Sequence, residues 1–360
     1  MLRFKKIAVK IGSNVLTRPD GTLDVTRMSA LVDQIAELHE QGVRIVLISS
    51  GAVASGRSEL KLKNIPDAVS ARQVFSAVGQ AKLINRYYEL FREHGIFCGQ
   101  VLTTKENFGS RRHYLNQRNC MSVMMENEVI PIVNENDTIS VTELMFTDND
   151  ELSGLIASMM NMEALIILSN VDGIYTGSPS DPAAKVIPEI KGGEIELSGF
   201  IQSDKSQFGR GGMMTKYNIA RKVADEGISV IIANGKKENI LPSLLKKNGA
   251  EVCTLFVPND NPTSSIKKWI AHSEGFAKGE LHINGGAREA LTGNSATSLL
   301  PVGITRIEGE FEKDDIVKIM DENGKQIGLG KVKYNNAQAC ELIGKQGKKP
   351  IVHYDYLYID

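Results

Sequence analysis

The chain has 360 residues, more than a single hydrophobic core usually spans, so its length predicts two domains. Its 42 Lys and Arg residues are balanced by 43 Asp and Glu residues, and the net charge of -1 excludes a general attraction to nucleic acid or to an anionic membrane. The four cysteines lie far apart and form no CxxC pair, so we interpret them as free thiols in a reducing cytoplasm.

The N-terminal segment, MLRFKKIAVKIG, contains an apolar run that Lys10 interrupts, and no small-residue cleavage site follows it. No apolar segment of the chain reaches the 18 residues that indicate a membrane span. We therefore expect a cytoplasmic protein that contacts no membrane.

Short apolar runs rich in Val and Ile predict strands that are buried on both faces, and segments with helical spacing of apolar residues lie between most of them. This alternation predicts an α/β three-layer sandwich with a mainly parallel sheet. The predicted strands are Ile7–Ile11, Val43–Ile48, Ile96–Leu102, Val129–Val133, Ala164–Leu168 and Ile228–Ala233.

The pattern changes after Trp269. From Gly279 onward the segments GELHI, TRIEGEF, DIVKIM and KQIGLGKVKY alternate between apolar and polar residues, and the Asn323-Gly324 pair predicts a hairpin turn. This pattern is typical of a small β-rich domain. We predict a first domain at 1–258, a linker at 259–278 and a second domain at 279–360.

Polar residues follow several predicted strands at the edge where a parallel sheet binds its ligands. Lys10, Gly12 and Ser13 follow the first strand, and the segment SSGAVASG follows the second, where glycine and alanine would let backbone amides approach a ligand. The fourth strand leads into Asn134, Glu135, Asn136 and Asp137, and the segment TDNDELSG opens a later helix. Each feature alone also fits a surface lysine, a loop or a helix N-cap, but their clustering predicts a binding site.

A second glycine-rich segment, GRGGMMTK, runs from Gly209 to Lys216 and enters a predicted helix at Tyr217–Glu226. It is not a Walker A loop, because Thr215 occupies the position where that motif requires glycine. Loop amides and a lysine near a helix start nevertheless favour an anion such as phosphate.

Several segments resemble, in the same order, the glutamate 5-kinase family of the amino-acid kinase superfamily. They are VKIGSNVL, ISSGAVASG, AVGQAKL, NQRNCMSVMMENEVIPIVNENDTIS, DNDELSGLIA, VDGIYT and GRGGMMTK. The C-terminal segments GELHINGGAREAL and SLLPVGITRIEGEFEKDDIVKI resemble a PUA domain, a small β-rich barrel. The resemblance extends over almost the whole chain.

The resemblance implies ATP-dependent phosphorylation of the γ-carboxylate of L-glutamate, the first step of proline biosynthesis. It implies catalytic roles for Lys10, Asp150 and Lys216, with Asp150 holding the two lysines in place. Glutamate would bind at Ser50, Gly51, Asn134, Asp137 and Asn149, with Asp137 receiving the ammonium and Glu135 acting as a structural partner. ATP would bind at Lys10, Gly12, Ser13, Ser169, Asn170, Arg210, Gly211, Gly212, Met213, Met214, Thr215 and Lys216.

The chemistry of such a reaction agrees with the residues present. A carboxylate with a reference pKa of ~4.3 is already ionised at neutral pH, so it needs no catalytic base. Two anionic reactants instead need positive charge, which two lysines, loop amides and Mg²⁺ would supply. We expect Mg²⁺ to be held mainly by the ATP phosphates, and the sequence leaves any protein ligand of the metal unknown. The six histidines show no metal-ligand spacing.

The chain departs from the family pattern in two places. Ser169-Asn170 replaces the Thr-Asp pair of many members, and Arg210 stands where threonine is common. Our hypothesis is that Arg210 partly offsets the change in nucleotide binding caused by Asn170.

Other functions remain open. The same scaffold serves N-acetylglutamate kinase, aspartokinase and uridylate kinase, although Asp137 suits an acceptor with a free ammonium. Arg57 and Arg72 could serve a nucleotide acceptor, but we expect both on a helix surface. A PUA domain could bind RNA, but residues 279–360 contain 10 Lys and Arg against 12 Asp and Glu, which disfavours nucleic acid.

The resemblance also implies partners. It implies a homo-oligomer, either dimer or tetramer, and feedback inhibition by proline involving Ser70–Gly79. The labile product would be handed to glutamate-5-semialdehyde dehydrogenase.

Overall fold

The computed structural model describes two compact units, which we call the N-terminal unit (residues 1–107 and 115–262) and the C-terminal unit (108–114 and 263–360). The described residues are 2–60, 67–109, 111–140, 146, 148–178, 181–191, 212–246, 251–259, 267, 269–270, 274–293 and 297–359. Most of the predicted linker at 259–278 therefore lies outside the described residues.

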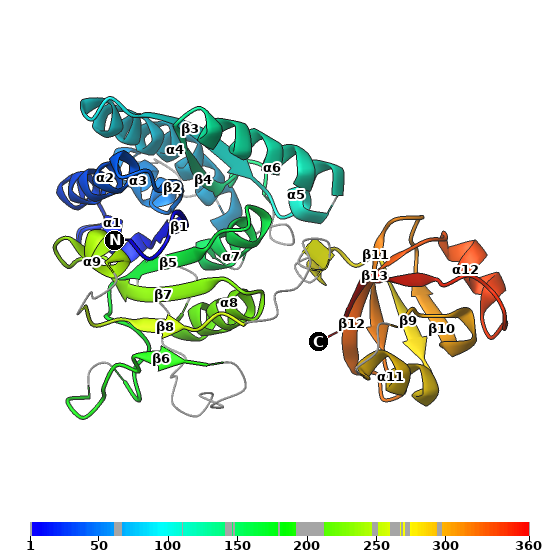
Figure 1. The fold of residues 1–360 in the computed structure, drawn as a ribbon. Coiled ribbons are helices and arrows are strands. Elements are labelled where there is room, and N and C mark those ends of the chain that lie inside the picture. Colours follow the sequence, from blue (N-terminus) through cyan, green and yellow to red (C-terminus); the bar gives the residue numbers. More distant parts are fainter. Residues whose placement is uncertain are drawn as a thin grey trace. The chain divides into compact units, whose positions relative to one another are not determined.

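The N-terminal unit is built on an eight-stranded sheet with the order β3-β4-β2-β1-β5-β7-β8-β6 (Figure 1). All neighbouring strands are parallel except β7 and β8, so the predicted α/β fold with a mainly parallel sheet is confirmed. The strands are β1 (Lys6–Ile11), β2 (Arg44–Ser49), β3 (Phe97–Thr103), β4 (Val129–Glu135), β5 (Ala164–Ser169), β6 (Glu189–Ile190), β7 (Ser229–Asn234) and β8 (Thr254–Phe256).

The six predicted strands are all present, each within two residues of its expected bounds. Sequence reasoning missed β6 and β8, which have only two and three residues and so carry no usable pattern.

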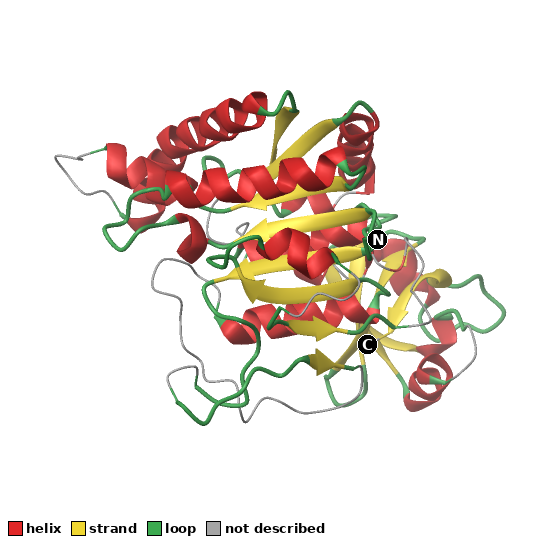
Figure 2. Ribbon diagram, turned by 60° about the vertical axis from the view of Figure 1, so that its left-hand side comes forward, coloured by secondary structure: helices red, strands yellow, loops and turns green. Residues whose placement is uncertain are grey.

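Helices pack against both faces of this sheet (Figure 2). The helices of this part of the chain are α1 (Ser13–Leu16), α2 (Val25–Glu40), α3 (Ala52–Glu59), α4 (Ala68–Glu93), α5 (Glu106–Gly109), α6 (Arg111–Glu126), α7 (Asn149–Met159), α8 (Met213–Asp225) and α9 (Ile240–Leu245), of which 108–109 in α5 and 111–114 in α6 belong to the C-terminal unit. Side chains alternate between the faces along a strand. In β1, Ile7, Val9 and Ile11 join the core formed with α2, α4 and α9. Lys10 is directed to the opposite face, where α7 packs against β1.

Helices α3 and α4 approach each other closely because glycines lie at their contact. A Cβ atom on Gly79 of α4 would lie 1.8 Å from the carbonyl oxygen of Ala52, and one on Gly56 of α3 would lie 1.8 Å from that of Phe75. Gly51, the N-cap of α3, has φ +109°, a conformation that glycine adopts without strain. Gly56 in the segment SSGAVASG therefore serves helix packing. The close contact holds α4 against α3, the helix that follows β2.

The C-terminal unit contains a five-stranded sheet with the order β10-β9-β11-β12-β13. The four predicted strand segments correspond to β9 (Gly279–Ile283), β10 (Ile304–Gly309), β11 (Ile316–Met320) and β12 (Gln326–Val332). The predicted turn between β11 and β12 is also present, with Gly324 at φ +75°. The sequence patterns missed β13 (Val352–Ile359) and the helices α11 (Gly285–Thr292) and α12 (Asn336–Leu342).

Among the described helices, none combines the length and the apolar character that crossing a membrane would require.

We expect Gly79→Ala to destabilise the N-terminal unit by at least about 2 kcal/mol, because backbone atoms of α3 cannot yield as a flexible side chain would. Urea unfolding followed by circular dichroism measures the change. Gly177→Ala is a matched control, since its Cβ would make only an ordinary contact with Ala184 at 3.7 Å. Equal stability of the two variants would contradict the close-packing account.

Candidate active site

Three charged residues from distant parts of the chain meet at the carboxyl edge of the large sheet. Asp150, the second residue of α7, forms ion pairs with Lys10 of β1 and Lys216 of α8. The distances from its two oxygens to the lysine Nζ atoms are 2.5 and 2.9 Å. Lys10 is only 4% exposed, Asp150 1% and Lys216 9%. Lys10 is thus a buried ion-pair partner rather than a surface lysine.

This cluster carries more positive than negative charge. Burial by itself raises the pKa of Asp150, but the two ammonium groups outweigh burial and hold that pKa below its ordinary value. Asp150 is therefore ionised at neutral pH, and two ammonium groups share one carboxylate. The excess positive charge in a buried place favours an anionic ligand.

Asp148 stands beside this cluster as the N-cap of α7, where its carboxylate accepts hydrogen bonds from the N–H groups of Asp150 and Glu151 at 2.9 and 3.0 Å. Burial, with the neighbouring Asp150 charge, raises its pKa to about 7. Its second oxygen is buried and has no hydrogen-bond partner among the described residues. Asp148 therefore caps the helix with one oxygen, and its other oxygen can still bind a metal ion or accept a hydrogen bond.

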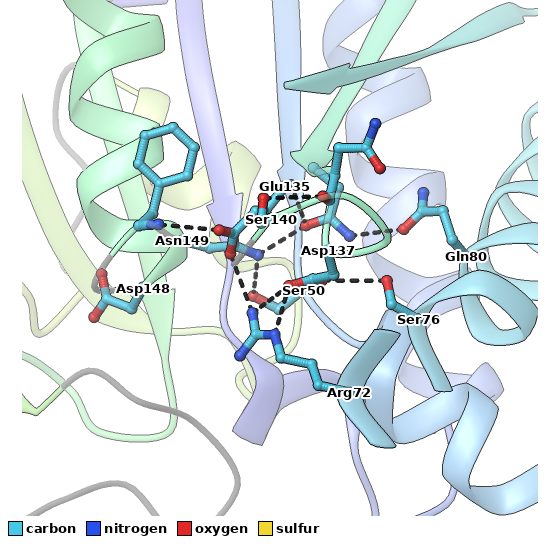
Figure 3. Close-up of polar contacts among 12 residues, drawn as sticks. Ser50, Arg72, Ser76, Gln80, Glu135, Asp137, Ser140, Asp148 and Asn149 are labelled. Atoms are coloured by element: carbon cyan, nitrogen blue, oxygen red, sulfur yellow. Dashed lines mark hydrogen bonds and ion pairs between the residues drawn. The ribbon is translucent and has the colours of Figure 1, made fainter. Parts of the chain in front are cut away.

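A second group of polar residues joins the ends of β2 and β4 to the start of α7 (Figure 3). The side-chain amide of Asn149 donates to Ser50 Oγ at 2.9 Å and to Asn134 Oδ1 at 3.1 Å. Asn134 in turn donates to Gln80 Oε1 at 2.7 Å. Because Asn149 and Asp150 are consecutive, this polar group and the lysine cluster share one helix start.

Residues of α4 bind two carboxylates at the end of β4 and just beyond it, Glu135 and Asp137. Arg72 contacts both Glu135 and Asp137, and Ser76 donates to Asp137 Oδ2 at 3.2 Å. Burial and the nearby Asp137 charge raise the pKa of Glu135 to about 7, while its other oxygen accepts the Phe146 N–H at 3.0 Å. The expectation that Arg72 lies on a helix surface is therefore wrong, because it faces these carboxylates.

The sequence did not predict that Arg72, Ser76 and Gln80 contact the acceptor residues, although Arg72 and Ser76 lie in the Ser70–Gly79 segment that the resemblance links to proline. The three residues are spaced by four along α4, so they lie on one face of the helix, and all three contact polar residues at the end of β4 or just beyond it. The spacing was visible in the sequence, but polar residues at helical spacing usually indicate a solvent-exposed face.

The predicted nucleotide residues that the structure describes lie around the same edge. Gly12 donates its N–H to the Leu168 carbonyl at 3.0 Å at the start of α1, whose first residue is Ser13. Asn170 is exposed, and its side-chain oxygen is 3.4 Å from Ser169 Oγ. Arg210 and Gly211 lie outside the described residues, as does the hypothesis that links Arg210 to Asn170.

Helix α8 begins at Met213, four residues earlier than the predicted helix at Tyr217–Glu226. Its N-cap is Gly212, which has no side chain to cap the first N–H groups. The first helical turn consists of Met213, Met214, Thr215 and Lys216. The N–H groups of a first turn lack partners within the helix and favour an anion.

The comparisons with known proteins cover both units. Residues 5–234 match the model of the amino acid kinase family, and residues 279–354 match the PUA domain model. The chain is 72% identical to the glutamate 5-kinase of Bacteroides thetaiotaomicron over 99% of each chain. It is 48% identical to the glutamate 5-kinase of Chlorobaculum tepidum over 99% of this chain and 98% of that one.

Two solved structures have a similar fold. The carbamate kinase from Giardia lamblia bound to AMP-PNP has a TM-score of 0.52 and 18% identity, covering 72% of this chain and all of that one. An isopentenyl phosphate kinase has a TM-score of 0.51 and 17% identity, covering 70% of this chain and all of that one. At these identities the similarity shows the fold.

We expect Asp150→Asn to destabilise the protein by about 3–5 kcal/mol at pH 7, since it leaves two buried ammonium groups without their carboxylate. The folded-state pKa of Asp150 lies below the ordinary value of 3.8, so its stabilising contribution is fully present above that value. Urea unfolding at pH 7 measures the loss.

Glu151→Gln is the control on the next residue of α7, because Glu151 is partly exposed and pairs with Lys105 at 3.5 Å. We expect it to cost no more than about 1 kcal/mol. A similar small cost for Asp150→Asn would show that the two lysines do not depend on Asp150.

Proposed function

The chain belongs to the amino acid kinase family and, within it, to the glutamate 5-kinases; from this we propose that it transfers a phosphoryl group from ATP to the γ-carboxylate of L-glutamate. The product is L-glutamate 5-phosphate, which begins proline biosynthesis. The observation that best supports the chemistry is the buried Asp150 shared by Lys10 and Lys216, next to the amide of Asn149.

In the proposed reaction the two lysines bring two anions together. The γ-carboxylate attacks phosphorus, a P–O bond forms, and the bond to the ADP leaving group breaks, so no proton has to be removed. Lys10 and Lys216 would neutralise the charge on the transferred group, and Asp150 would keep both ammonium groups oriented. The first-turn N–H groups of α8 would add further positive polarity.

The acceptor would bind at the polar residues joining β2, β4 and α7. Asp137 is the residue that we assign to the α-ammonium, because it is an anionic group only 4% exposed. Ser50, Gly51, Asn134 and Asn149 would hold the remaining polar groups. Asn149 would thus place the acceptor beside the lysine cluster, since the next residue is Asp150.

Mg²⁺ fits the same edge of the sheet. Asp148 offers a buried carboxylate oxygen without a hydrogen-bond partner among the described residues, next to the ion pairs of Asp150. We infer that Asp148 would face the ion, whose other ligands would come mainly from the ATP phosphates. When bound, Mg²⁺ would supply positive charge to the phosphates.

We propose a cytoplasmic homo-oligomer, dimer or tetramer, that is inhibited by proline through Ser70–Gly79 and passes its product to glutamate-5-semialdehyde dehydrogenase. We also propose that the chain consists of an amino-acid kinase domain at 1–258, a linker at 259–278 and a PUA-like domain at 279–360.

The first test is acyl-phosphate formation trapped with hydroxylamine, with ATP, Mg²⁺ and one acceptor at a time. We expect a strong signal with glutamate and at most a weak one with N-acetylglutamate or aspartate, and no ADP release that depends on UMP. Lys216→Ala is the inactive control, because it removes one of the two ammonium groups that the reaction needs. Absence of a glutamate signal, or a stronger signal with another acceptor, would overturn the proposed substrate.

We expect Asp137→Asn to raise the KM for glutamate roughly 10- to 100-fold, which corresponds to the ~1.5–3 kcal/mol of a hydrogen bond between charged groups. The KM for ATP should stay within about twofold, since a residue that binds only the acceptor does not alter nucleotide affinity. Initial rates over a matrix of both substrate concentrations separate the two constants. A larger change in the ATP constant would remove Asp137 from the acceptor site.

A further inference from the structure

Arg72 uses only part of its guanidinium in contacts with the protein (Figure 3). Its Nε donates to Asp137 Oδ1 at 2.6 Å, and its Nη2 contacts Glu135 Oε2 at 3.1 Å and also Asp137. The third nitrogen, Nη1, has no hydrogen-bond or ion-pair partner among the described residues. The Arg72 side chain is 24% exposed, whereas the Glu135 and Asp137 side chains are 3% and 5% exposed.

The backbone of α4 fixes Arg72 in this place. The N-cap of α4 is Asp67, whose carboxylate accepts hydrogen bonds from the N–H groups of Val69 and Ser70 at 3.0 Å. One turn beyond Arg72, Ser76 binds the same Asp137, and the close contact at Gly79 holds α4 against α3. The guanidinium is therefore a preorganised donor rather than a mobile surface group.

The charges around Arg72 are complementary to an α-amino acid. An acceptor that places its α-ammonium on Asp137 carries its α-carboxylate on the same carbon atom, and that carboxylate needs a cationic partner nearby. A guanidinium binds a carboxylate through paired N–H donors in a fixed planar geometry. Without acceptor, the guanidinium of Arg72 faces the carboxyl groups of both Glu135 and Asp137. The ammonium and carboxylate of an amino acid add no net charge to this group.

We propose that Arg72 is a specificity-determining residue that binds the α-carboxylate of the acceptor through Nη1 while Asp137 binds the α-ammonium. This inference rests on the proposed function and adds to it the group that recognises the α-carboxylate. It predicts selection for a free α-carboxylate, because a neutral α-amide offers Arg72 no negative charge and leaves the positive charge of the α-ammonium uncompensated beside the guanidinium.

An opposite role for Arg72 is competition with the substrate, in which its guanidinium occupies the place of the α-ammonium on Asp137. The two roles make opposite predictions. Loss of the guanidinium weakens glutamate binding if Arg72 binds the carboxylate, and it strengthens glutamate binding if Arg72 competes with the ammonium.

The test compares L-glutamate with its α-amide, which keeps the α-ammonium and the γ-carboxylate, in the hydroxylamine assay with the full chain. For the parent protein we expect kcat/KM to favour glutamate at least 100-fold. For Arg72→Gln we expect this ratio to fall below about 10, through loss of glutamate turnover and little change with the amide. Arg72→Lys should give an intermediate ratio, and the KM for ATP should stay unchanged.

Arg57→Gln is the matched control, because Arg57 lies on α3 with its guanidinium 5.6 Å from the centre of the Phe75 ring. It should keep the parent ratio. Three results would each overturn the proposal. They are equal losses with both acceptors in Arg72→Gln, a lowered KM for glutamate in that variant, and equal use of the amide and glutamate by the parent protein. A parent protein inactive with glutamate would instead overturn the proposed function itself.

Discussion

The ion pairs of Asp150 with Lys10 and Lys216 are the interaction on which the rest of the site depends. They join β1, α7 and α8, which lie far apart in sequence, at one edge of the sheet. A buried cluster with two positive groups and one negative group is costly to form unless an anion completes it. That cost is a reason to expect a phosphoryl group there, because the transferred anion would supply the missing negative charge.

The start of α7 couples this cluster to the acceptor site. Asn149 and Asp150 are neighbours, so the residue that contacts Ser50 and Asn134 is covalently tied to the one that contacts both lysines. An acceptor held at the first and a phosphoryl group held at the second would meet at short range. Positioning of this kind is the main requirement when the nucleophile is already ionised. The site accordingly needs no histidine or other base.

Much of the fold follows from local sequence, whereas part of the site does not. Continuous apolar runs predict the six longer strands of the large sheet, and the rule that ligands bind at strand carboxyl ends directs attention to Lys10 and Asp137. The bridging of two lysines by Asp150 was expected only from family resemblance. The inward direction of Arg72 depends on how α4 packs on α3 through Gly56 and Gly79, a contact between segments that no single helical pattern reveals.

The most direct test of the account is a crystal structure with a non-hydrolysable ATP analogue, Mg²⁺ and L-glutamate bound together. We predict that the γ-phosphoryl group lies within hydrogen-bond distance of both the Lys10 and Lys216 Nζ atoms. We also predict the γ-carboxylate of glutamate facing that group beside Asn149, with the α-ammonium on Asp137. A γ-phosphoryl group that contacts neither lysine would contradict the central role of the Asp150 ion pairs.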